Sequence, residues 1–431
     1  MKLAKLSLAA MVVAGLASSS FAADSLEGMF KEGKASGELK AYYFDRDAGA
    51  AGSSDIFTTG LMLNYKTGSL NGFSLNFTGQ ASASPFADKD AKLAGAAGGF
   101  AGDMWGSGAV LSEAYVAYTM KNTTVLVGRM FLDTPLVASS GSRMTKQAFE
   151  GAAIINADLP NTTLIAGYVQ KFQGRTNGNG DIGEFSKTMS TGSGFPENVL
   201  GTLVPDSSLY VDSGAFTLVA INKSIPNLTL TAAYAQAMDV KNFNANLTID
   251  DVKIAYAEAA YAGTAGSFTY GLAAQYYYNS ISGSNIAALE SNNLWGAKAS
   301  IGYGAFGGYV AYSKVSDETR VGGIAVGVIT GLGGGADLAY TASPINSSSY
   351  ANDTEAYKIG VTYAVLKNAN LGLNYTSNEI DATNYKAGFT AFEADYAFEG
   401  ALKGLSTSLI YEDASKDANG NELWFKAGYK F

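Results

Sequence analysis

The last ten residues of the chain, 422–431, alternate strictly between two kinds of side chain. One set is apolar and ends in aromatics: Leu423, Phe425, Ala427, Tyr429 and Phe431. The other set is mostly polar or charged: Glu422, Trp424, Lys426, Gly428 and Lys430. Because successive side chains of a β-strand point to opposite faces, this segment has one apolar and one charged face. We expect it to be the closing strand of a membrane barrel.

The same period of two recurs along the chain and predicts about eighteen strands, an even number within the range of single-chain barrels. The predicted strands are 37–46, 55–66, 73–82, 109–120, 123–130, 147–156, 163–172, 215–222, 228–236, 252–262, 268–279, 294–303, 306–315, 355–365, 371–377, 385–398, 405–412 and 422–431. Short turns alternate with long connections at 83–108, 130–146, 173–214 and 316–354. This alternation predicts an all-β, antiparallel, up-and-down transmembrane barrel with short periplasmic turns and long extracellular loops.

The two faces of these strands differ in composition. Leu, Phe, Tyr, Val and Ala occupy the face expected to meet lipid, and Ser, Thr, Asn, Gln, Gly, Lys and Glu occupy the other. A barrel of this size has a lumen wide enough for water. A Lys facing lipid near the midplane costs about 2–4 kcal/mol, so charges are expected inside. We therefore expect these side chains to line the lumen, either as solvated wall charges or as guides for solutes: Lys40, Arg46, Lys171, Lys253, Lys298, Lys358, Lys426 and Lys430.

Two further features of the faces concern the barrel's rims. Lys314 falls on the outward face, near the loop-side rim. Aromatics near the strand ends fit interfacial girdles, although any single one could be an ordinary strand aromatic. They are Tyr65, Tyr234, Tyr303, Tyr363, Tyr411 and Tyr429.

One long connection, within 128–151, mixes apolar residues with Asp133, Arg143 and Lys146. A wide barrel needs a constriction, and a loop inside it must pack against the wall while presenting charge. Opposed charges at a narrow point select solutes by size and polarity. We expect this loop to fold into the lumen with these three residues at the constriction; the alternative is a loop lying flat on the outer rim.

The first 22 residues have the three parts of an export signal. Lys2 and Lys5 precede a short apolar stretch, and Ser20-Phe21-Ala22 is a small-x-small cleavage pattern. The stretch is shorter than the roughly 20 residues of a membrane helix. We expect a signal peptide at 1–22, a periplasmic lead-in at 23–36 and the barrel at 37–431, in the outer membrane of a Gram-negative bacterium.

Composition narrows the possible activities. The net charge is −9, and removal of Lys2 and Lys5 leaves 29 − 2 = 27 basic and 38 acidic residues, or −11, which argues against a nucleic-acid partner. The chain has no His, the usual general base near neutral pH, and no motif for carboxylate-pair or Ser-Lys chemistry, so an enzyme is not expected. It has no Cys, so stability must come from barrel closure instead of disulfides. No cofactor is expected.

Residues 177–184 space oxygen ligands somewhat like a calcium loop. The segment lacks the central Gly after Asp181 and a matching downstream Glu. An exposed Gly/Asn loop is the alternative, and no metal site is predicted.

The chain resembles the OprD-like substrate-selective porins of Gram-negative outer membranes. The resemblance rests on Tyr42-Tyr43-Phe44-Asp45-Arg46-Asp47, the Gly-Glu-Leu-Lys start at 37–40, and the pattern of the third loop. That pattern has Gly128 at the strand exit, then Pro135, Ser142-Arg143 and Phe149-Glu150-Gly151. The resemblance implies an eighteen-stranded channel, often trimeric, with the third loop inside and basic side chains guiding carboxylate-bearing solutes.

By this resemblance Arg46, Arg129 and Arg143 would guide solutes, and we also expect Arg129 and Glu150 to face the lumen. Two departures stand out: the chain has only five arginines, and Lys146 stands where the family often has Pro. We expect a porin for passive, partly selective diffusion of small hydrophilic solutes and ions. Its expected partners are outer-membrane lipid, these solutes, further copies in a homotrimer, and the barrel-assembly machinery, which would recognise the strand ending in Phe431. The alternative is a closed, surface-exposed structural or adhesive barrel, which would not conduct.

Overall fold

The computed structural model describes residues 23–47, 49, 52–86, 106–177, 180–192, 198–199, 202–203, 208–241, 250–283, 291–317, 320–321, 324–325, 327–345 and 348–431. The expected signal peptide lies outside the described residues. In the described part, no helix is long and apolar enough to cross a membrane.

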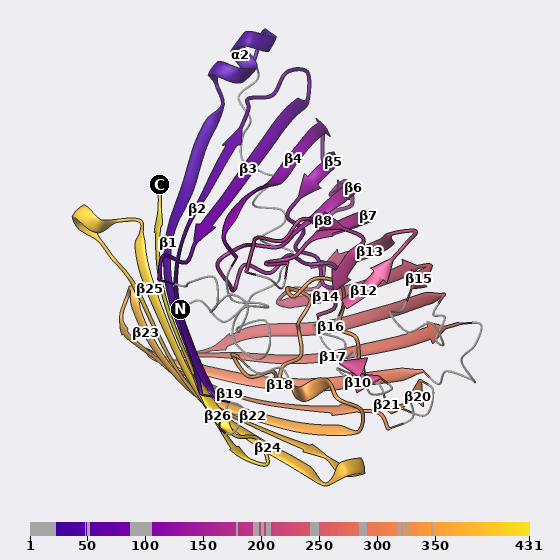
Figure 1. The fold of residues 1–431 in the computed structure, drawn as a ribbon, viewed down its shortest axis with the longest axis vertical. Coiled ribbons are helices and arrows are strands. Elements are labelled where there is room, and N and C mark those ends of the chain that lie inside the picture. Colours follow the sequence, from indigo (N-terminus) through magenta and orange to yellow (C-terminus); the bar gives the residue numbers. More distant parts are fainter. Residues whose placement is uncertain are drawn as a thin grey trace.

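The described residues form an 18-stranded closed antiparallel barrel (Figure 1). Its strands are β1 Lys34–Asp47, β2 Ser53–Lys66, β3 Phe73–Ala83, β4 Gly108–Met120, β5 Thr123–Met130, β6 Ala148–Asn156, β7 Thr162–Gln173, β13 Ala215–Asn222, β14 Leu228–Met238, β16 Asp251–Ala265, β17 Phe268–Ser282, β18 Asn292–Tyr303, β19 Phe306–Val315, β22 Thr354–Leu366, β23 Ala369–Ile380, β24 Tyr385–Ala397, β25 Leu405–Lys416 and β26 Gly420–Lys430. The strand number and the antiparallel order agree with the sequence prediction, and the strand boundaries differ from the predicted ones by at most four residues.

Shorter elements lie in the lead-in and the connections. The lead-in forms helix α2 Leu26–Lys31, which begins where the Ser25 hydroxyl accepts a hydrogen bond from Gly28 N. The connections hold β8 Phe185–Ser186, β9 Thr188–Ser190, β10 Asn198–Val199, β11 Thr202–Leu203, β12 Ser208–Val211, β15 Val240–Lys241, β20 Arg320–Val321, β21 Ile324–Ala325, η3 Ser348–Tyr350, η4 Asp381–Thr383 and η5 Gly400–Leu402.

Pairing of the first and last strands closes the barrel. β26 runs antiparallel to β1 from Glu38↔Lys430 to Asp47↔Asn421. Phe431 extends this seam, because Gly37 N donates to Phe431 O at 2.9 Å and Phe431 N to Gly37 O at 3.1 Å. An inward ion pair between Arg46 and Glu422 lies at its loop-side end. Closure leaves no unpaired strand edge in the wall, as a membrane barrel requires.

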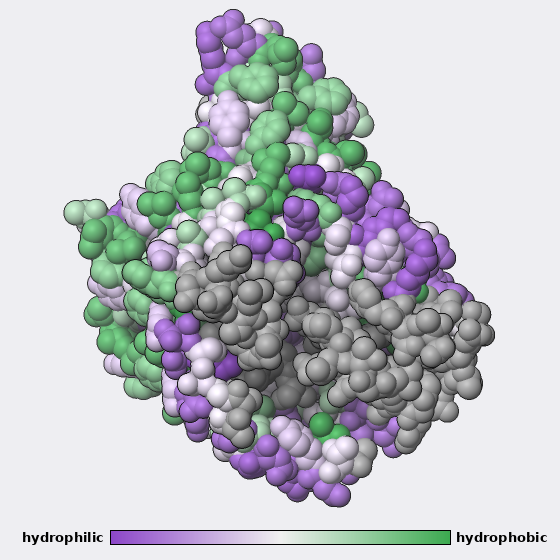
Figure 2. All heavy atoms as spheres, in the orientation of Figure 1, coloured by the Kyte–Doolittle hydropathy of each residue, from purple (hydrophilic) through white to green (hydrophobic). Residues whose placement is uncertain are grey.

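The outward face is apolar. Leucines, valines and aromatics at alternate positions are exposed on the bare barrel, among them Leu39, Leu63, Val310, Val361 and Phe425. Figure 2 shows apolar side chains gathered over the strands at the left, and hydrophilic ones around the strand ends at the right. The girdle aromatics predicted from the sequence all lie on this outward face, and several stack in pairs across neighbouring strands, such as Phe306 with Tyr363 at 4.6 Å between ring centroids.

Two connections fold into the lumen: the third loop, residues 131–147, as predicted, and the second lumen loop, residues 327–345. They pair through their backbones, because Leu332 N donates to Leu136 O (2.8 Å) and Ala138 N to Leu332 O (3.0 Å). Gly333 has a φ of +81°, and a Cβ there would collide with the Ala138 carbonyl, so this close approach requires glycine.

The loops give the barrel an apolar core that the sequence does not predict. Met130, Phe149 and Phe172 of the wall belong to one buried cluster with Leu136 of the third loop and Leu332 of the second lumen loop. The inward faces of β5–β7 are therefore apolar. The expectation of a uniformly polar inward face is wrong there, because loops and not water cover those strands.

Two neighbouring residues of β22 provide a test of the face assignment. Val361 points outward with 56% of its surface exposed, and Thr362 points into the lumen. Val361→Lys should lower the free energy of unfolding in lipid vesicles by about 2–4 kcal/mol, because its charge would meet hydrocarbon. Thr362→Lys, the matched control, should lower the free energy of unfolding much less. If urea titrations give the same loss of unfolding free energy for both variants, the assignment of Val361 to the outward face and Thr362 to the lumen is contradicted.

Candidate functional site: a cationic constriction in the lumen

Wall side chains hold the third loop inside the barrel. Gln80 of β3 donates from Nε2 to Lys146 O and accepts from Lys146 N, both at 2.8 Å. Lys40 of β1 donates to Met144 O at 3.1 Å, and Lys426 of β26 donates to Ser142 O at 2.6 Å. β26, β1, β2 and β3 follow one another in the wall across the closing seam, so the three strands that hold the loop lie on one side of the barrel. The loop is therefore fixed against one side of the lumen.

Three cations converge on Ser140 and Ser142 of this loop. Arg175 donates to the Ser140 hydroxyl at 2.7 Å, and Arg143 to the Ser142 hydroxyl at 3.0 Å. Lys426 binds the Ser142 carbonyl, as described above. These acceptors are neutral oxygens of the loop, and the contacts orient the three cations toward one place. We call Arg143, Arg175 and Lys426 the cationic cluster.

An aromatic side chain of the wall supports this cluster. The Trp424 ring lies 4.0 Å from the Arg143 guanidinium carbon and 4.4 Å from Lys426 Nζ. Cations over an aromatic face are attracted by the electron-rich ring. Trp424 is itself fixed, because its indole N–H donates to Glu422 at 2.9 Å and its ring packs edge-on against Phe44.

Asp133 and Lys146, the other two predicted constriction residues, lie in the third loop, and the backbone of Lys146 is held by Gln80 of β3. Lys146 Nζ lies 4.3 Å from the Phe131 ring centroid. Burial lowers the pKa of Lys146, while the nearby carboxylates of Glu113 and Asp133 act in the opposite direction. The structure thus brings Asp133, Arg143 and Lys146 into one lumen loop.

Acidic side chains of the lumen instead accept hydrogen bonds that hold the loops in place. Glu113 accepts from Asn76 at 3.1 Å and from the backbone N of Phe131 at 3.2 Å. Glu412 accepts from the second lumen loop at Ile345 N, also at 3.2 Å, and Glu258 accepts from the Tyr340 hydroxyl at 2.6 Å. Their negative charge is therefore distributed around the wall, whereas the cationic cluster is concentrated at one loop.

Six of the predicted wall charges point inward: Lys40, Arg46, Lys298, Lys358, Lys426 and Lys430. Lys358 donates to Ala342 O of the second lumen loop at 2.6 Å. Lys298 lies 4.8 Å from the ring centroid of Tyr309 on the neighbouring strand. These two lysines belong to β18 and β22, away from the closing seam, and lie outside the cationic cluster.

Arg129, Glu150 and Lys171 point outward, so the expectation that they line the lumen is wrong. Arg129 Nε lies 2.9 Å and Lys171 Nζ 2.8 Å from the Glu150 carboxylate, at paired positions of β5, β6 and β7. Their neighbours Met130, Phe149 and Phe172 need the inward face to pack against the loops. A β-bulge places Lys171 opposite Glu150 and reverses the alternation of β7 at that point.

Lys253 also points outward, contrary to the prediction, and for the same reason. Its neighbours Val252 and Ile254 are almost completely buried on the inward face, in the cluster that contains Val328 and Ile329 of the second lumen loop. Lys253 instead lies 4.0 Å from Asp251 at the loop-side end of β16.

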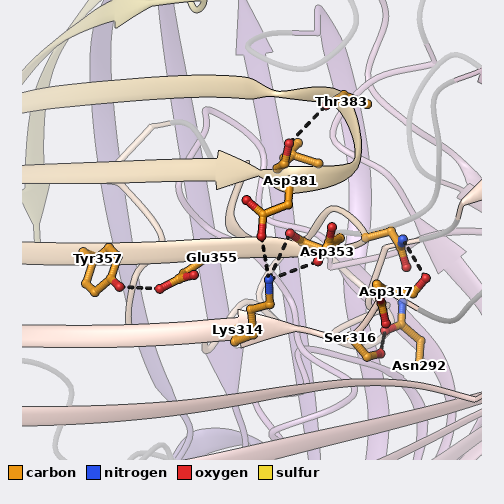
Figure 3. Close-up of polar contacts among 11 residues, drawn as sticks. Asn292, Lys314, Ser316, Asp317, Asp353, Glu355, Tyr357, Asp381 and Thr383 are labelled. Atoms are coloured by element: carbon orange, nitrogen blue, oxygen red, sulfur yellow. Dashed lines mark hydrogen bonds and ion pairs between the residues drawn. The ribbon is translucent and has the colours of Figure 1, made fainter.

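Lys314 lies on the outward face at the loop-side rim, as predicted. Figure 3 shows it reaching toward two carboxylates, Asp353 before β22 and Asp381 after β23, at 3.0 and 3.5 Å. Ion pairing at the rim offsets the cost of a cation beside lipid.

Sequence reasoning missed Arg175 and the second lumen loop. Arg175 lies two residues past the end of β7, and alternation does not indicate it, because the consecutive Phe172 and Gln173 are both buried. The second lumen loop carries an unusually apolar, glycine-rich run for an exterior loop, from Val328 to Ala336.

No metal centre is formed by the described residues: they contain no group of three or more acidic side chains arranged to hold an ion. The calcium-like segment is described only in part, because residues 178 and 179 lie outside the described ranges. Its described ends close a turn, in which Asn177 N donates to Asp181 O at 2.9 Å.

Comparison with known proteins identifies this architecture. Residues 27–202 match the sequence profile described as outer membrane porin, OprD family. Among solved structures the chain is similar to OccK9 (OpdG) of Pseudomonas aeruginosa, with 14% identity, 94% of this chain and 99% of that chain covered, and a TM-score of 0.76. No curated protein sequence matches the chain.

Two further solved structures share the fold. A BenF-like porin of Pseudomonas fluorescens Pf-5 has 18% identity, coverage of 94% of this chain and 100% of that chain, and a TM-score of 0.73. Pseudomonas aeruginosa OpdK, solved with vanillate, has 16% identity, the same coverage, and a TM-score of 0.72.

The double contact of Gln80 with Lys146 predicts a role in holding the third loop. Gln80→Ala would leave a buried N–H and C=O of the loop without these partners, a cost of about 1–3 kcal/mol per group. Single-channel recordings should then show more frequent brief conductance changes than the unchanged protein. Asn64→Ala is the control, since the described hydrogen bonds of Asn64 go to β3. Identical recordings from the two variants would contradict this role.

Proposed function

We propose that the chain, an outer-membrane porin with the OprD-family fold, forms a water-filled channel that passes small anions, carboxylates in particular. The main support is the position of the cationic cluster. Its three side chains meet at Ser140 and Ser142 of the third loop, inside the lumen. A concentrated positive charge attracts anions from the lumen and disfavours cations of similar size.

The chemistry of the cluster suits a carboxylate. An arginine presents several N–H donors in a planar fork that matches the two oxygens of a carboxylate. Arg143 of the loop, Arg175 after β7 and Lys426 of β26 can exchange such a solute between them, as passage through a channel requires. The vanillate of the OpdK structure is an aromatic carboxylate, and the buried ring of Trp424 beside the cluster supports the same solute class for this chain.

Other expectations from the sequence stay predictions. They are the signal peptide at 1–22, recognition of the strand ending in Phe431 by the barrel-assembly machinery, and the absence of catalytic activity. The closed structural or adhesive barrel is not favoured, because both the family match and the fold are those of porins.

Neutralising two members of the cationic cluster tests the proposal. The double variant Arg143→Gln with Arg175→Gln keeps hydrogen-bond donors at both positions but removes two positive charges. One charge contributes about 1 kcal/mol at 4 Å in water, so the chloride-to-potassium permeability ratio should fall by about fivefold or more. The measurement is the reversal potential of single channels in a planar bilayer under a potassium chloride gradient.

Lys253→Gln is the matched control, because it removes a positive charge from the outward face. Its permeability ratio should equal that of the unchanged protein. If the double variant also keeps the original ratio, the cationic cluster does not set selectivity and the proposal fails.

A further inference from the structure

Two groups of ion pairs lie on the outer side of the loop-side rim, which we call the rim triads: Arg129–Glu150–Lys171 and Lys187–Asp212–Lys241. In the first, the two cations lie 2.9 and 2.8 Å from the carboxylate. In the second, Lys187 Nζ lies 2.6 Å from the carboxylate, and Lys241 also contacts it. Hydrogen bonds from these lysines lower the pKa of Asp212 to about 2, so it is ionised at neutral pH. Each triad thus has a net charge of 2 − 1 = +1.

The two triads are neighbours on the outer side of β7. Phe185 of β8, whose ring centroid lies 4.3 Å from the Arg129 guanidinium carbon, is two residues from Lys187. Tyr168, an outward residue of β7, donates from its hydroxyl to the carbonyl of the residue after Asp212 at 2.9 Å. Figure 1 shows β8 and β12 close to β7 and β13, at the right. The cations of both triads and these two aromatic rings therefore form one patch of the rim.

The loop-side rim of β19–β23 has the opposite charge. Figure 3 shows Lys314 between two carboxylates, Asp353 and Asp381, so here two acids share one cation. The charged residues of this group sum to 2 − 4 = −2; they are Lys314, Lys386, Asp353, Asp381, Glu355 and Glu379. The rim triads, together with Asp239, which accepts from the Ser213 hydroxyl, sum to 4 − 3 = +1. The two sides of the rim therefore differ in the sign of their charge.

An apolar groove of about 510 Å³ lies on the turn side of the rim triads, on the outer face of β6, β7, β13 and β14. Its outward side chains are small or aliphatic and include Ile154, Leu164, Ala166, Leu218, Ala220 and Ala232. Small side chains allow an apolar chain to lie close to the wall.

The groove and the triads are separated by the distance that a lipid requires. Ala166 in the groove and Lys171 in the rim are 171 − 166 = 5 residues apart on β7. Five residues span about 17 Å along a strand, or about 13 Å along the membrane normal at a tilt of roughly 40°. This is about half of an apolar band of roughly 25 Å, so the triads lie at the height of lipid head groups when the groove lies near the midplane.

A second groove provides a comparison within the same barrel. It has a volume of about 600 Å³ and lies on the outer face of β16–β19. Tyr312 and Tyr357 line it, and Lys314 and Glu355 of the acidic rim lie two residues nearer the loops on the same strands. Both grooves are apolar, but they lie next to rims of opposite charge. Only the groove on β6, β7, β13 and β14 therefore suits the acyl chain of an anionic lipid.

We infer that the rim triads and the groove beside them bind a phosphorylated glycolipid of the outer leaflet, with phosphates at the triads and an acyl chain in the groove. Arginine and lysine donate charge-assisted hydrogen bonds to phosphate oxygens. Exposed ion pairs are weak, so Glu150 and Asp212 leave these cations able to bind a further anion. Clusters of basic side chains beside membrane spans recognise anionic lipid head groups in the same way. This inference does not depend on which solute the channel passes.

Titration with lipid A, a glycolipid with two phosphates and several acyl chains, tests the site. Native mass spectrometry of the protein purified from membranes in mild detergent gives the bound fraction and the apparent Kd. The double variant Arg129→Gln with Lys187→Gln removes one cation from each triad and should raise the Kd about tenfold or more. Lys314→Gln with Lys386→Gln, the matched control, removes two cations from the acidic rim and should leave the Kd unchanged. Equal single-channel conductance of the variants shows that all barrels are folded.

The groove is tested by a second pair of variants. Ala220→Trp fills the groove beside the triads and should raise the Kd for lipid A severalfold, whereas Ala274→Trp lies on the outer face of β17, beside the second groove, and should not. Inorganic phosphate provides a further comparison. If it displaces lipid A while Ala220→Trp has no effect, the triads bind phosphate alone and the lipid site is refuted.

Two other results would overturn the inference. An equal Kd for the double variant and its matched control would mean that lipid A binds through its acyl chains without the triads. Oligomers of the unchanged protein that hold no lipid A would mean that protein and not lipid covers this face.

Discussion

The backbone pairing of two loops inside the barrel is the interaction on which the rest of this structure depends. Residues 136–138 of the third loop and Leu332 of the second lumen loop exchange hydrogen bonds of 2.8 and 3.0 Å, at a point where only glycine fits at position 333. Buried backbone groups need such partners, and each loop provides them for the other. The wall strands nearby then turn apolar side chains inward to pack against the loops, which places Arg129, Glu150, Lys171 and Lys253 outside.

The packing of the third loop against the wall also fixes the position of the charges that are proposed to select solutes. A loop held against the closing seam by Gln80, Lys40 and Lys426 keeps Arg143 at a fixed place in the lumen. Arg175 reaches it from the end of β7. Glu113, Glu258 and Glu412 accept hydrogen bonds that position the loops. Arg143, Arg175 and Lys426 lie together at the third loop.

Periodicity predicts the wall of this protein well, because one side of every strand must meet lipid. It predicts the strands, their order and the outward Lys314. The inward third loop is predicted separately, from its mixture of apolar and charged residues and from the need for a constriction. Periodicity predicts the inward face wrongly on β5–β7 and β16, because the prediction assumes that water lines the whole lumen. The inward faces of these strands are apolar and pack against loops that are distant in sequence. The bulge before Lys171 is likewise a tertiary feature, and Arg175 lies past the strand end, where alternation is not normally applied.

The most direct test of the account compares two solutes of nearly equal size and different charge. Uptake of benzoate and benzamide into vesicles containing the purified channel should differ, with benzoate entering several times faster because the cationic cluster attracts its carboxylate. Vesicles without protein correct for direct passage through lipid. Equal channel-dependent rates, or faster entry of benzamide, would contradict a lumen organised to pass carboxylates.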